Sequence, residues 1–301
     1  MLSVSHVRKA FGSVQAVCDV SFSLGRGSAF GLLGPNGAGK TTVMRMILRI
    51  LESDGGGITW DGVPVSRRTA RTFGYLPEER GLYGKMKARD QIIFFARLHG
   101  IAGREAQRRT DRWIERLDLR EAAQRACAEL SKGNQQKVQV ACAAVHEPGL
   151  LILDEPFSGL DPVNAEMLSA ILQELQAKGT AMLLSSHQMW QLEHLCRSFC
   201  IISNGSNRAA GTLAELRAAW PTRIIKIEPG SEAVRLVMHT VPQGRFLPPE
   251  EGAAYYEIPA QTPLPELLKR LVNADAITRF ESVEPSLHEI YLDAIGKGNT
   301  D

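Results

Sequence analysis

The stretch AFGLLGPNGAGKTTV, residues 29–43, decides the fold. Its apolar start is typical of a buried strand, residues 34–41 fit the pattern G-x-x-x-x-G-K-[ST], and the following residues have the apolar spacing of a helix. Glycines let a backbone wrap closely around phosphate groups, and the N-terminus of the following helix favours negative charge. The stretch therefore predicts a phosphate-binding loop between a strand and a helix.

The side chains of this loop have separate predicted roles. We expect Lys40 to reach the β- and γ-phosphates of a nucleotide and the Thr41 hydroxyl to coordinate Mg²⁺. A glycine-rich turn that only packs is the alternative, and the strand–loop–helix context argues against it. The residues predicted to contact the nucleotide here are Gly34, Pro35, Asn36, Gly37, Ala38, Gly39, Lys40, Thr41 and Thr42.

A second apolar strand, residues 150–153, ends in two carboxylates, Asp154 and Glu155. Buried carboxylates are costly unless a cation or hydrogen bonds satisfy them. In a chain with a phosphate-binding loop, Asp154 is predicted to hold Mg²⁺, and Glu155 to accept a proton from an attacking water. An acidic turn with no catalytic role is the alternative interpretation of this pair.

A polar turn precedes the helix that is expected to start at Asn134 and to run to about His146, in ELSKGNQQKVQV, residues 129–140. The turn offers backbone amides, the Ser131 hydroxyl and a positive helix end, and it contains no acidic residue. It therefore suits a phosphate, but these residues alone do not say whose phosphate it meets.

Composition limits the class of protein. The chain has 301 residues, 44% hydrophobic and 23% charged, with a net charge of +2, which is too small to indicate a nucleic-acid or membrane-surface role by itself. Five cysteines without a CxxC pair predict free thiols in a reducing cytoplasm. Neither a signal peptide nor an apolar run that could span a bilayer is expected, so any membrane role would need a spanning partner.

The pattern of elements predicts two domains. Short strands are expected over residues 1–33 and 55–77, and charges at helical spacing over 86–127 predict a helical subdomain at about 80–140. From 134 onward helices and strands alternate, which predicts a parallel sheet. The character changes near 218–222, where the order approximates β-α-β-β-α-β. We therefore expect domains at 1–220 and 221–301.

Together these motifs, over about residues 1–215, resemble the ATP-binding-cassette (ABC) ATPases, the nucleotide-binding subunits of transporters. Residues 130–134 match the signature turn, residues 158–161 the aspartate loop, His187 the switch histidine, and Phe11 the aromatic that stacks on adenine. The resemblance implies an α/β phosphate-loop NTPase cassette with a helical subdomain, followed by a small α+β C-terminal domain.

The resemblance also implies a head-to-tail pair of cassettes with ATP at the interface. Ser131 and Gly133 of one cassette would then bind the γ-phosphate of ATP held by the other. His187 would contact the γ-phosphate within its own chain and share catalysis with Glu155, while Asp161 would belong to the nucleotide interface.

Two positions depart from the family pattern. The signature turn reads LSKGN where the family usually has LSGGQ, with Asn134 a possible cap of the following helix. Glu78 occupies the position where the family usually has a glutamine. A carboxylate can bind Mg²⁺ directly or through water, so Glu78 joins Thr41 and Asp154 as a candidate metal ligand. These departures resemble a subset of exporter cassettes.

The resemblance implies an ATP-hydrolysing motor subunit that uses ATP and Mg²⁺ to power export through a separate integral membrane permease. The protein would be cytoplasmic, peripheral on the inner face of the cell membrane, paired with a second cassette, and without a nucleic-acid partner. Phe94, Phe95 and Leu98 are expected either to line a groove for the permease or to pack in the core. A soluble cassette ATPase acting on nucleic acid or ribosomes, and a low-turnover regulatory ATP-binding module, remain alternatives. The cargo is left open.

Overall fold

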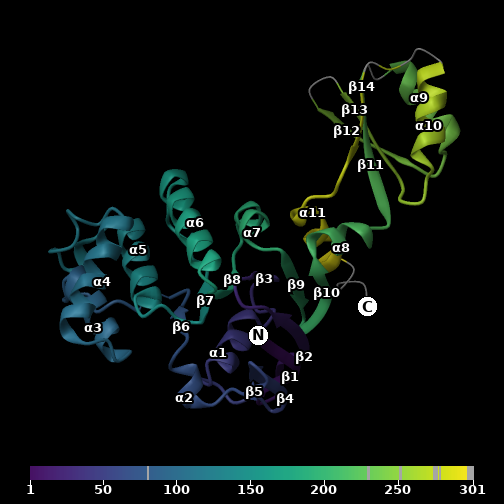
Figure 1. Cartoon of the computed structure of the whole chain (residues 1–301). Helices are drawn as coiled ribbons and strands as arrows, with labels where there is room; N and C mark the ends of the chain where they lie inside the picture. Colours follow the sequence, from purple (N-terminus) through teal and green to yellow (C-terminus); the bar gives the residue numbers. More distant parts are fainter. Residues whose placement is uncertain (80, 229–230, 251–252, 274–276, 278, 297–301) are drawn as a thin grey trace. The chain divides into compact units, whose positions relative to one another are not determined.

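The strand that leads into the phosphate-binding loop, β3 (Ala29–Leu33), lies inside a ten-stranded sheet (Figure 1). The structure is a computed structural model that describes residues 1–79, 81–228, 231–250, 253–273, 277 and 279–296. The chain divides into two units, Met1–Leu213 with Ala294–Asp301, and Ala214–Asp293.

The sheet of the first unit has the strand order β5-β4-β1-β2-β10-β9-β3-β8-β7-β6. Its other strands are β1 (Leu2–Phe11), β2 (Val14–Leu24), β4 (Gly55–Trp60), β5 (Val63–Pro64), β6 (Gly74–Leu76), β7 (Leu150–Asp154), β8 (Ala181–Ser185), β9 (Ser198–Ser203) and β10 (Ser206–Thr212).

The predicted parallel arrangement is confirmed for β9, β3, β8, β7 and β6, which all run in one direction. It does not extend to the whole sheet. β1 pairs antiparallel with β2 and β4, β4 with β5, and β9 with β10. Several of these strands are joined by turns of a few residues, and such turns permit only antiparallel pairing.

The strands around the loop are buried because they are apolar except at the last residues of β7 and β8, Asp154 and Ser185. Every residue of β3, β7 and β8 is buried, as expected for parallel strands with both faces covered. Val43, Met44, Met46 and Ile47 of α1 (Lys40–Ile47) join the same core cluster. Burying each side chain of this size stabilises the fold by roughly 1.5–3 kcal/mol, so the loop between β3 and α1 has a rigid support.

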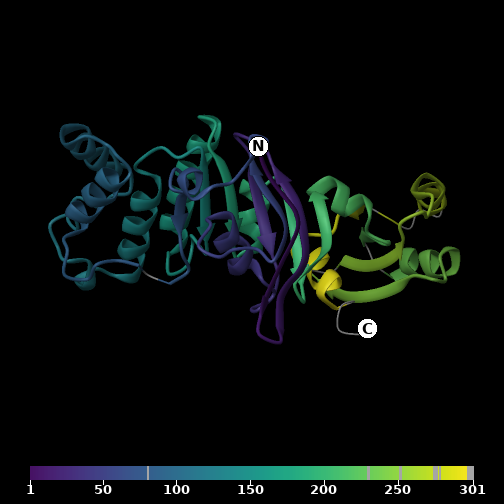
Figure 2. The same ribbon diagram turned by 90° about the horizontal axis from the view of Figure 1, so that it is seen from below.

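Helices α3, α4 and α5 form a group of their own beside the β6 edge of the sheet (Figures 1 and 2). The helices of this unit are α1, α2 (Arg67–Ala70), α3 (Ala88–Leu98), α4 (Gly103–Arg116), α5 (Lys132–Ala144), α6 (Pro162–Ala177) and α7 (Met189–Leu195), with a 3₁₀ turn at Cys127–Glu129.

The start of α5 corrects one prediction. The helix begins at Lys132 rather than at Asn134, and Ser131 is its N-cap, whose hydroxyl accepts a hydrogen bond from the Asn134 amide at 3.3 Å. Serine is among the best N-cap residues because its side-chain oxygen satisfies an otherwise unpaired amide of the first turn. Asn134 therefore does not cap the helix.

The second unit holds a four-stranded antiparallel sheet in the order β12-β13-β11-β14. Its core joins Ile225, Ile227, Tyr256 and Ile258 of the sheet to the helices α9 and α10. The β-α-β-β-α-β order is the one that the sequence pattern indicated. Its elements are α8 (Leu213–Ala218), β11 (Thr222–Glu228), α9 (Ser231–Thr240), β12 (Arg245–Glu250), β13 (Ala253–Pro259), α10 (Leu264–Asn273), β14 (Arg279–Val283) and α11 (Leu287–Gly296).

Candidate active site

Most of the residues singled out from the sequence meet in one cavity of about 220 Å³. It lies where the parallel strands β3, β6, β7 and β8 end, because the loops that follow parallel strands share one edge of a sheet. The cavity is lined by Ala16, Asn36, Gly37, Gly39, Lys40, Thr41, Thr42, Glu78, Asp154, Glu155 and His187.

The backbone of the loop requires glycine at two of its positions, Gly34 and Gly39. A Cβ on Gly34 would lie 2.3 Å from the Ile202 carbonyl oxygen. Gly39 has φ 106°, and a Cβ there would lie 2.7 Å from the Ala16 carbonyl oxygen. Glycine alone adopts such a φ without strain and allows such close approach. The tight turn that results brings the first amides of α1 toward the cavity, which is the arrangement that binds phosphate.

Lys40 provides the cation of this cavity. Its Nζ donates to the carbonyl oxygens of Gly34 at 2.7 Å and Pro35 at 3.1 Å, so the side chain folds back over the loop. Burial lowers the pKa of Lys40, while the charges of Asp154, Glu155 and Glu78 oppose that shift. Carbonyl oxygens of the loop thus hold a cation at a cavity that the loop also lines, and this combination fits the phosphates of a nucleotide.

Thr41 and Asp154 are in direct contact at the base of the cavity. The Thr41 hydroxyl donates to Asp154 Oδ2 at 2.8 Å, and the Ser185 hydroxyl donates to Asp154 Oδ1. Asp154 is 1% exposed, so its orientation is fixed by these partners. A hydroxyl beside a carboxylate is a suitable partial ligand set for Mg²⁺. Among the described residues no three His, Cys, Asp or Glu side chains are placed to hold a metal ion by themselves, so an ion here would take further ligands from phosphates and water.

Glu155 and His187 form the second contact pair. Glu155 has φ 55°, a strained value for a residue with a side chain. Its Oε1 lies 3.4 Å from His187 Nε2, and the His187 amide donates to Oε2 at 3.3 Å. Burial raises the pKa of Glu155, and His187 opposes the rise. A carboxylate with a raised pKa is a better proton acceptor for a water at its side.

Four residues proposed from the family resemblance lie outside the described lining of this cavity: Phe11, Ser131, Gly133 and Asp161. Phe11 is 48% exposed at the end of β1. Ser131 caps α5, and Asp161 caps α6 by accepting from the Asn164 amide at 2.9 Å. A Cβ on Gly133 would lie 3.4 Å from the Gly159 carbonyl oxygen, so the signature turn lies beside the aspartate loop.

Sequence reasoning missed two residues that position the acidic pair. Ser185 holds Asp154 and also accepts from the Glu155 amide at 3.3 Å. Gln136 donates through Nε2 to the carbonyl oxygens of Glu155 at 3.1 Å and Pro156 at 2.9 Å. Ser185 is two residues before His187, at the end of the apolar stretch AMLLS, so its place at the end of a buried strand was a usable signal.

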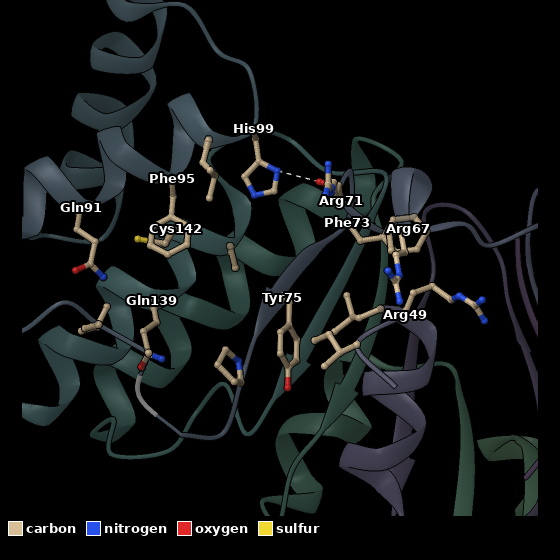
Figure 3. Close-up of a pocket in the computed structure, with 18 residues that line it drawn as sticks. Arg49, Arg67, Arg71, Phe73, Tyr75, Gln91, Phe95, His99, Gln139 and Cys142 are labelled. Carbon is tan, nitrogen blue, oxygen red and sulfur yellow. Dashed lines mark hydrogen bonds between the residues drawn. The ribbon is translucent and has the colours of Figure 1, made fainter. Parts of the chain in front are cut away.

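A larger groove of about 860 Å³ lies between the helical group and the sheet (Figure 3). Its walls carry Gln91, Phe95, His99, Gln139 and Cys142 on one side and Arg49, Arg67, Arg71 and Phe73 on the other, with Tyr75 between them. Leu98 also lines the groove and is 67% exposed, so it is not a core residue. Phe94 is outside the lining and packs edge-on against Tyr83 and Phe95.

Two histidines stack at the edge of this groove. The rings of His99 and His146 are parallel, with centroids 3.6 Å apart. His99 Nδ1 donates to the Arg71 carbonyl oxygen at 3.0 Å (Figure 3). Burial and, secondarily, the charge of His99 lower the pKa of His146 to about 4. The folded protein therefore holds His146 neutral at pH values where an unfolded chain would protonate it.

This difference predicts a pH-dependent stability. Between pH 6.5 and about 4 the unfolded chain binds the extra proton, so the stability of the fold falls as the pH is lowered through this window. From pH 7 to pH 5 we expect a loss of about 2 kcal/mol that the variant His146→Leu does not show. Urea unfolding at the two pH values measures it, with the exposed His194→Leu as control. An equal pH dependence in wild type and His146→Leu would contradict the assignment.

No helix in the described part of the chain is long and apolar enough to cross a membrane.

A family model for "ABC transporter" matches residues 17–158, and one for "ATP-binding protein DrrA1-3-like, C-terminal domain" matches residues 211–295.

Individual proteins are similar in sequence to this chain over 70% to 98% of its length. The uncharacterized ABC transporter ATP-binding protein YhaQ of Bacillus subtilis is 41% identical over 98% of this chain and 99% of its own length. The Nod factor export ATP-binding protein I of Sinorhizobium fredii is 37% identical over 70% of this chain and 62% of its own length. A solved structure described as the ATP-binding subunit of an ABC transporter, 34% identical, superimposes with a TM-score of 0.68 over 72% of this chain and 92% of that chain.

Proposed function

This chain belongs to the family of ABC transporter ATP-binding proteins and is an ATPase, and from this premise we propose that it powers export through a separate membrane permease. The observation that carries the proposal is the cavity in which Lys40, Thr41, Asp154, Glu155 and His187 converge. A relative named for Nod factor export supports the direction of transport. The permease would hold the protein at the inner face of the cell membrane.

Different residues of the cavity would bind the phosphates, bind the metal ion and accept the proton during hydrolysis. Lys40 and the amides of the loop would bind the β- and γ-phosphates, and Thr41, Asp154 and Glu78 would hold Mg²⁺. The ion, when bound, offsets the negative charge of the phosphates. Glu155 accepts the proton of the attacking water, and His187 orients Glu155 through the contacts at 3.4 Å and 3.3 Å.

A second cassette completes the site. Ser131 and Gly133 lie outside the cavity of their own chain, which fits a role at the nucleotide of a partner cassette. The Ser131 oxygen accepts the bond that caps α5, so its hydroxyl hydrogen remains able to donate to a phosphate oxygen. Asp161 would lie at the same interface, and Phe11, exposed at the end of β1, would stack on adenine.

The groove between the helical group and the sheet would receive the permease. Its lining combines aromatic and aliphatic side chains with three arginines, Arg49, Arg67 and Arg71, which suits a short amphipathic segment. Pro77, Gly81 and Leu82 line the groove, while Glu78 of the same short segment lines the nucleotide cavity. Movement of this segment would therefore connect permease docking to the nucleotide. The division into a cassette at 1–220 and an accessory domain at 221–301 stays a prediction.

Docking can be tested by changing the most exposed apolar residue of the groove. Leu98→Glu should reduce recovery of the membrane permease with the full-length protein at least tenfold, because a charge would have to be buried at the interface. ATP binding, at a separate cavity, should be unchanged. The measurement is co-purification from detergent extract, with Val63→Glu as the control at a similarly exposed strand position.

Three outcomes would contradict the proposal. Normal permease recovery with Leu98→Glu would show that the groove is not the docking site. ATP hydrolysis that is stimulated by DNA or RNA, with no membrane protein recovered, would identify the soluble nucleic-acid ATPase instead. ATP binding without turnover in the presence of the permease would identify a regulatory module.

A further inference from the structure

The hairpin of β1 and β2 leads from the nucleotide cavity to Phe11, the residue that would stack on adenine. Phe11 pairs with Val14 across a turn of two residues at the tip of the hairpin. Between Lys9 and Ala10 the register shifts, because β2 has Ala16 there as an extra residue, a β-bulge. Ala16 lines the nucleotide cavity. The strand pair that carries Phe11 therefore also touches the cavity.

The end of β1 that carries Phe11 extends beyond the neighbouring strand β4. β4 begins at Gly55, which pairs with Arg8, so it does not reach the last residues of β1. Asp54 takes the place of a strand there. Its amide donates to the Arg8 carbonyl oxygen at 2.9 Å, and its Oδ2 accepts from the Ala10 amide at 2.8 Å. Asp54 thus satisfies backbone groups that the edge of the sheet would otherwise leave unpaired, and it fixes the backbone next to Phe11.

Asp54 also holds the side chain that covers the Phe11 ring. Its Oδ1 accepts a hydrogen bond from Lys9 Nζ at 2.6 Å, and this bond keeps the pKa of Asp54 below its ordinary value. Lys9 and Phe11 are two residues apart in one strand, so their side chains share a face. The Lys9 ammonium group lies over the Phe11 ring, 5.7 Å from its centroid, and the Lys9 side chain is only 16% exposed. The ammonium group is therefore held in place against the ring.

We propose that Lys9 and Asp54 are positioning residues for the nucleotide base, which hold the Phe11 ring with one face under an ammonium group and present the other face to adenine. The inference rests on the proposed function, in which Phe11 stacks on the base of ATP. A cation is attracted to the negative face of an aromatic ring and so restrains it. Phe11 is 48% exposed and has little packing of its own. A ring that is already held loses less side-chain freedom when a base binds, which favours binding.

Removal of the cation should weaken nucleotide binding. Lys9→Met should raise the dissociation constant of a non-hydrolysable ATP analogue about fivefold, and Asp54→Ala should act in the same direction because it releases Lys9. Lys9→Arg keeps a cation that can lie over the ring and should bind as the wild type does. Arg8→Met is the matched control, because it removes one positive charge from the neighbouring residue, whose side chain lies beside Gly55. Calorimetric titration of the full-length proteins with Mg²⁺ measures each affinity.

A double-mutant cycle shows whether Lys9 acts through Phe11. Phe11→Ala should weaken binding of the analogue about tenfold, the size of a lost stacking contact with a base. In that background Lys9→Met should cause no further loss, because the ring that it holds is gone. A direct contact of Lys9 with the nucleotide would instead give the same loss with and without the ring.

The outcomes separate the inference from the proposed function. Wild-type affinity in Lys9→Met, or an equal loss from it in the wild type and in Phe11→Ala, would overturn the inference while leaving ATP binding intact. Wild-type affinity in Phe11→Ala would also overturn it, because the base would then lie elsewhere. Absence of analogue binding by the wild-type protein with Mg²⁺ would refute the proposed function itself.

Discussion

Glu155→Gln should lower the rate of ATP hydrolysis about a thousandfold while ATP remains bound. Glutamine has nearly the same shape and still receives the amide hydrogen bond from His187, but it cannot accept a proton from water. General-base catalysis contributes roughly 10²–10⁴ to a rate, so the loss should lie within that range. Phosphate release at saturating ATP and Mg²⁺ measures turnover, and equilibrium dialysis with labelled ATP measures binding.

The same variant tests the paired cassettes. With hydrolysis blocked, each ATP should stay between the phosphate-binding loop of one cassette and the signature turn of the other and hold the cassettes together, so size-exclusion chromatography with ATP and Mg²⁺ should show a dimer. Glu166→Gln, on the exposed side of α6, makes the same chemical change away from the cavity and should behave as wild type. Near-normal turnover in Glu155→Gln would remove Glu155 from the base role. A monomer with bound ATP would contradict the paired arrangement.

Local sequence predicted the parts of the site that short segments build alone. The loop from Gly34 to Thr42 needs only its glycines, the strand before it and the helix after it, and Asp154 and Glu155 need only the end of an apolar strand. Parallel pairing then brings the two segments together, because every strand of such a sheet ends at the same edge. These features depend on neighbours in sequence and on one topological rule.

The features that sequence reasoning missed depend on partners far apart in the chain. Sequence reasoning expected Phe94, Phe95 and Leu98 at a groove but not its other wall, because the lining takes residues from Leu48 to Ala143. β10 (SNRAAGT) lacks strong strand formers, and its pairing with β9 decides its conformation. The contacts of Ser185 and Gln136 with the acidic turn likewise exist only after folding.

Lys40→Ala should weaken ATP binding by roughly ten- to a hundredfold or more. The ammonium group supplies charge-assisted hydrogen bonds to the phosphates, and each is worth about 1.5–3 kcal/mol. Its removal also leaves Asp154, Glu155 and Glu78 without their cation, so the cavity becomes more repulsive to a triphosphate. Calorimetric titration of the full-length protein with a non-hydrolysable analogue and Mg²⁺ measures the change.

Lys178→Ala is the control for that loss, because it removes one exposed lysine that lies outside the nucleotide cavity. Its affinity should equal that of the wild type, which excludes a general effect of net charge. The bonds from Lys40 to Gly34 and Pro35 also hold the loop in its turn, so part of the loss could come from a loosened loop. Lys40→Arg separates the two causes: it keeps the charge but replaces a compact ammonium with a planar fork. Restored affinity in Lys40→Arg would assign the loss to charge, whereas wild-type affinity in Lys40→Ala would show that the loop does not bind the phosphates.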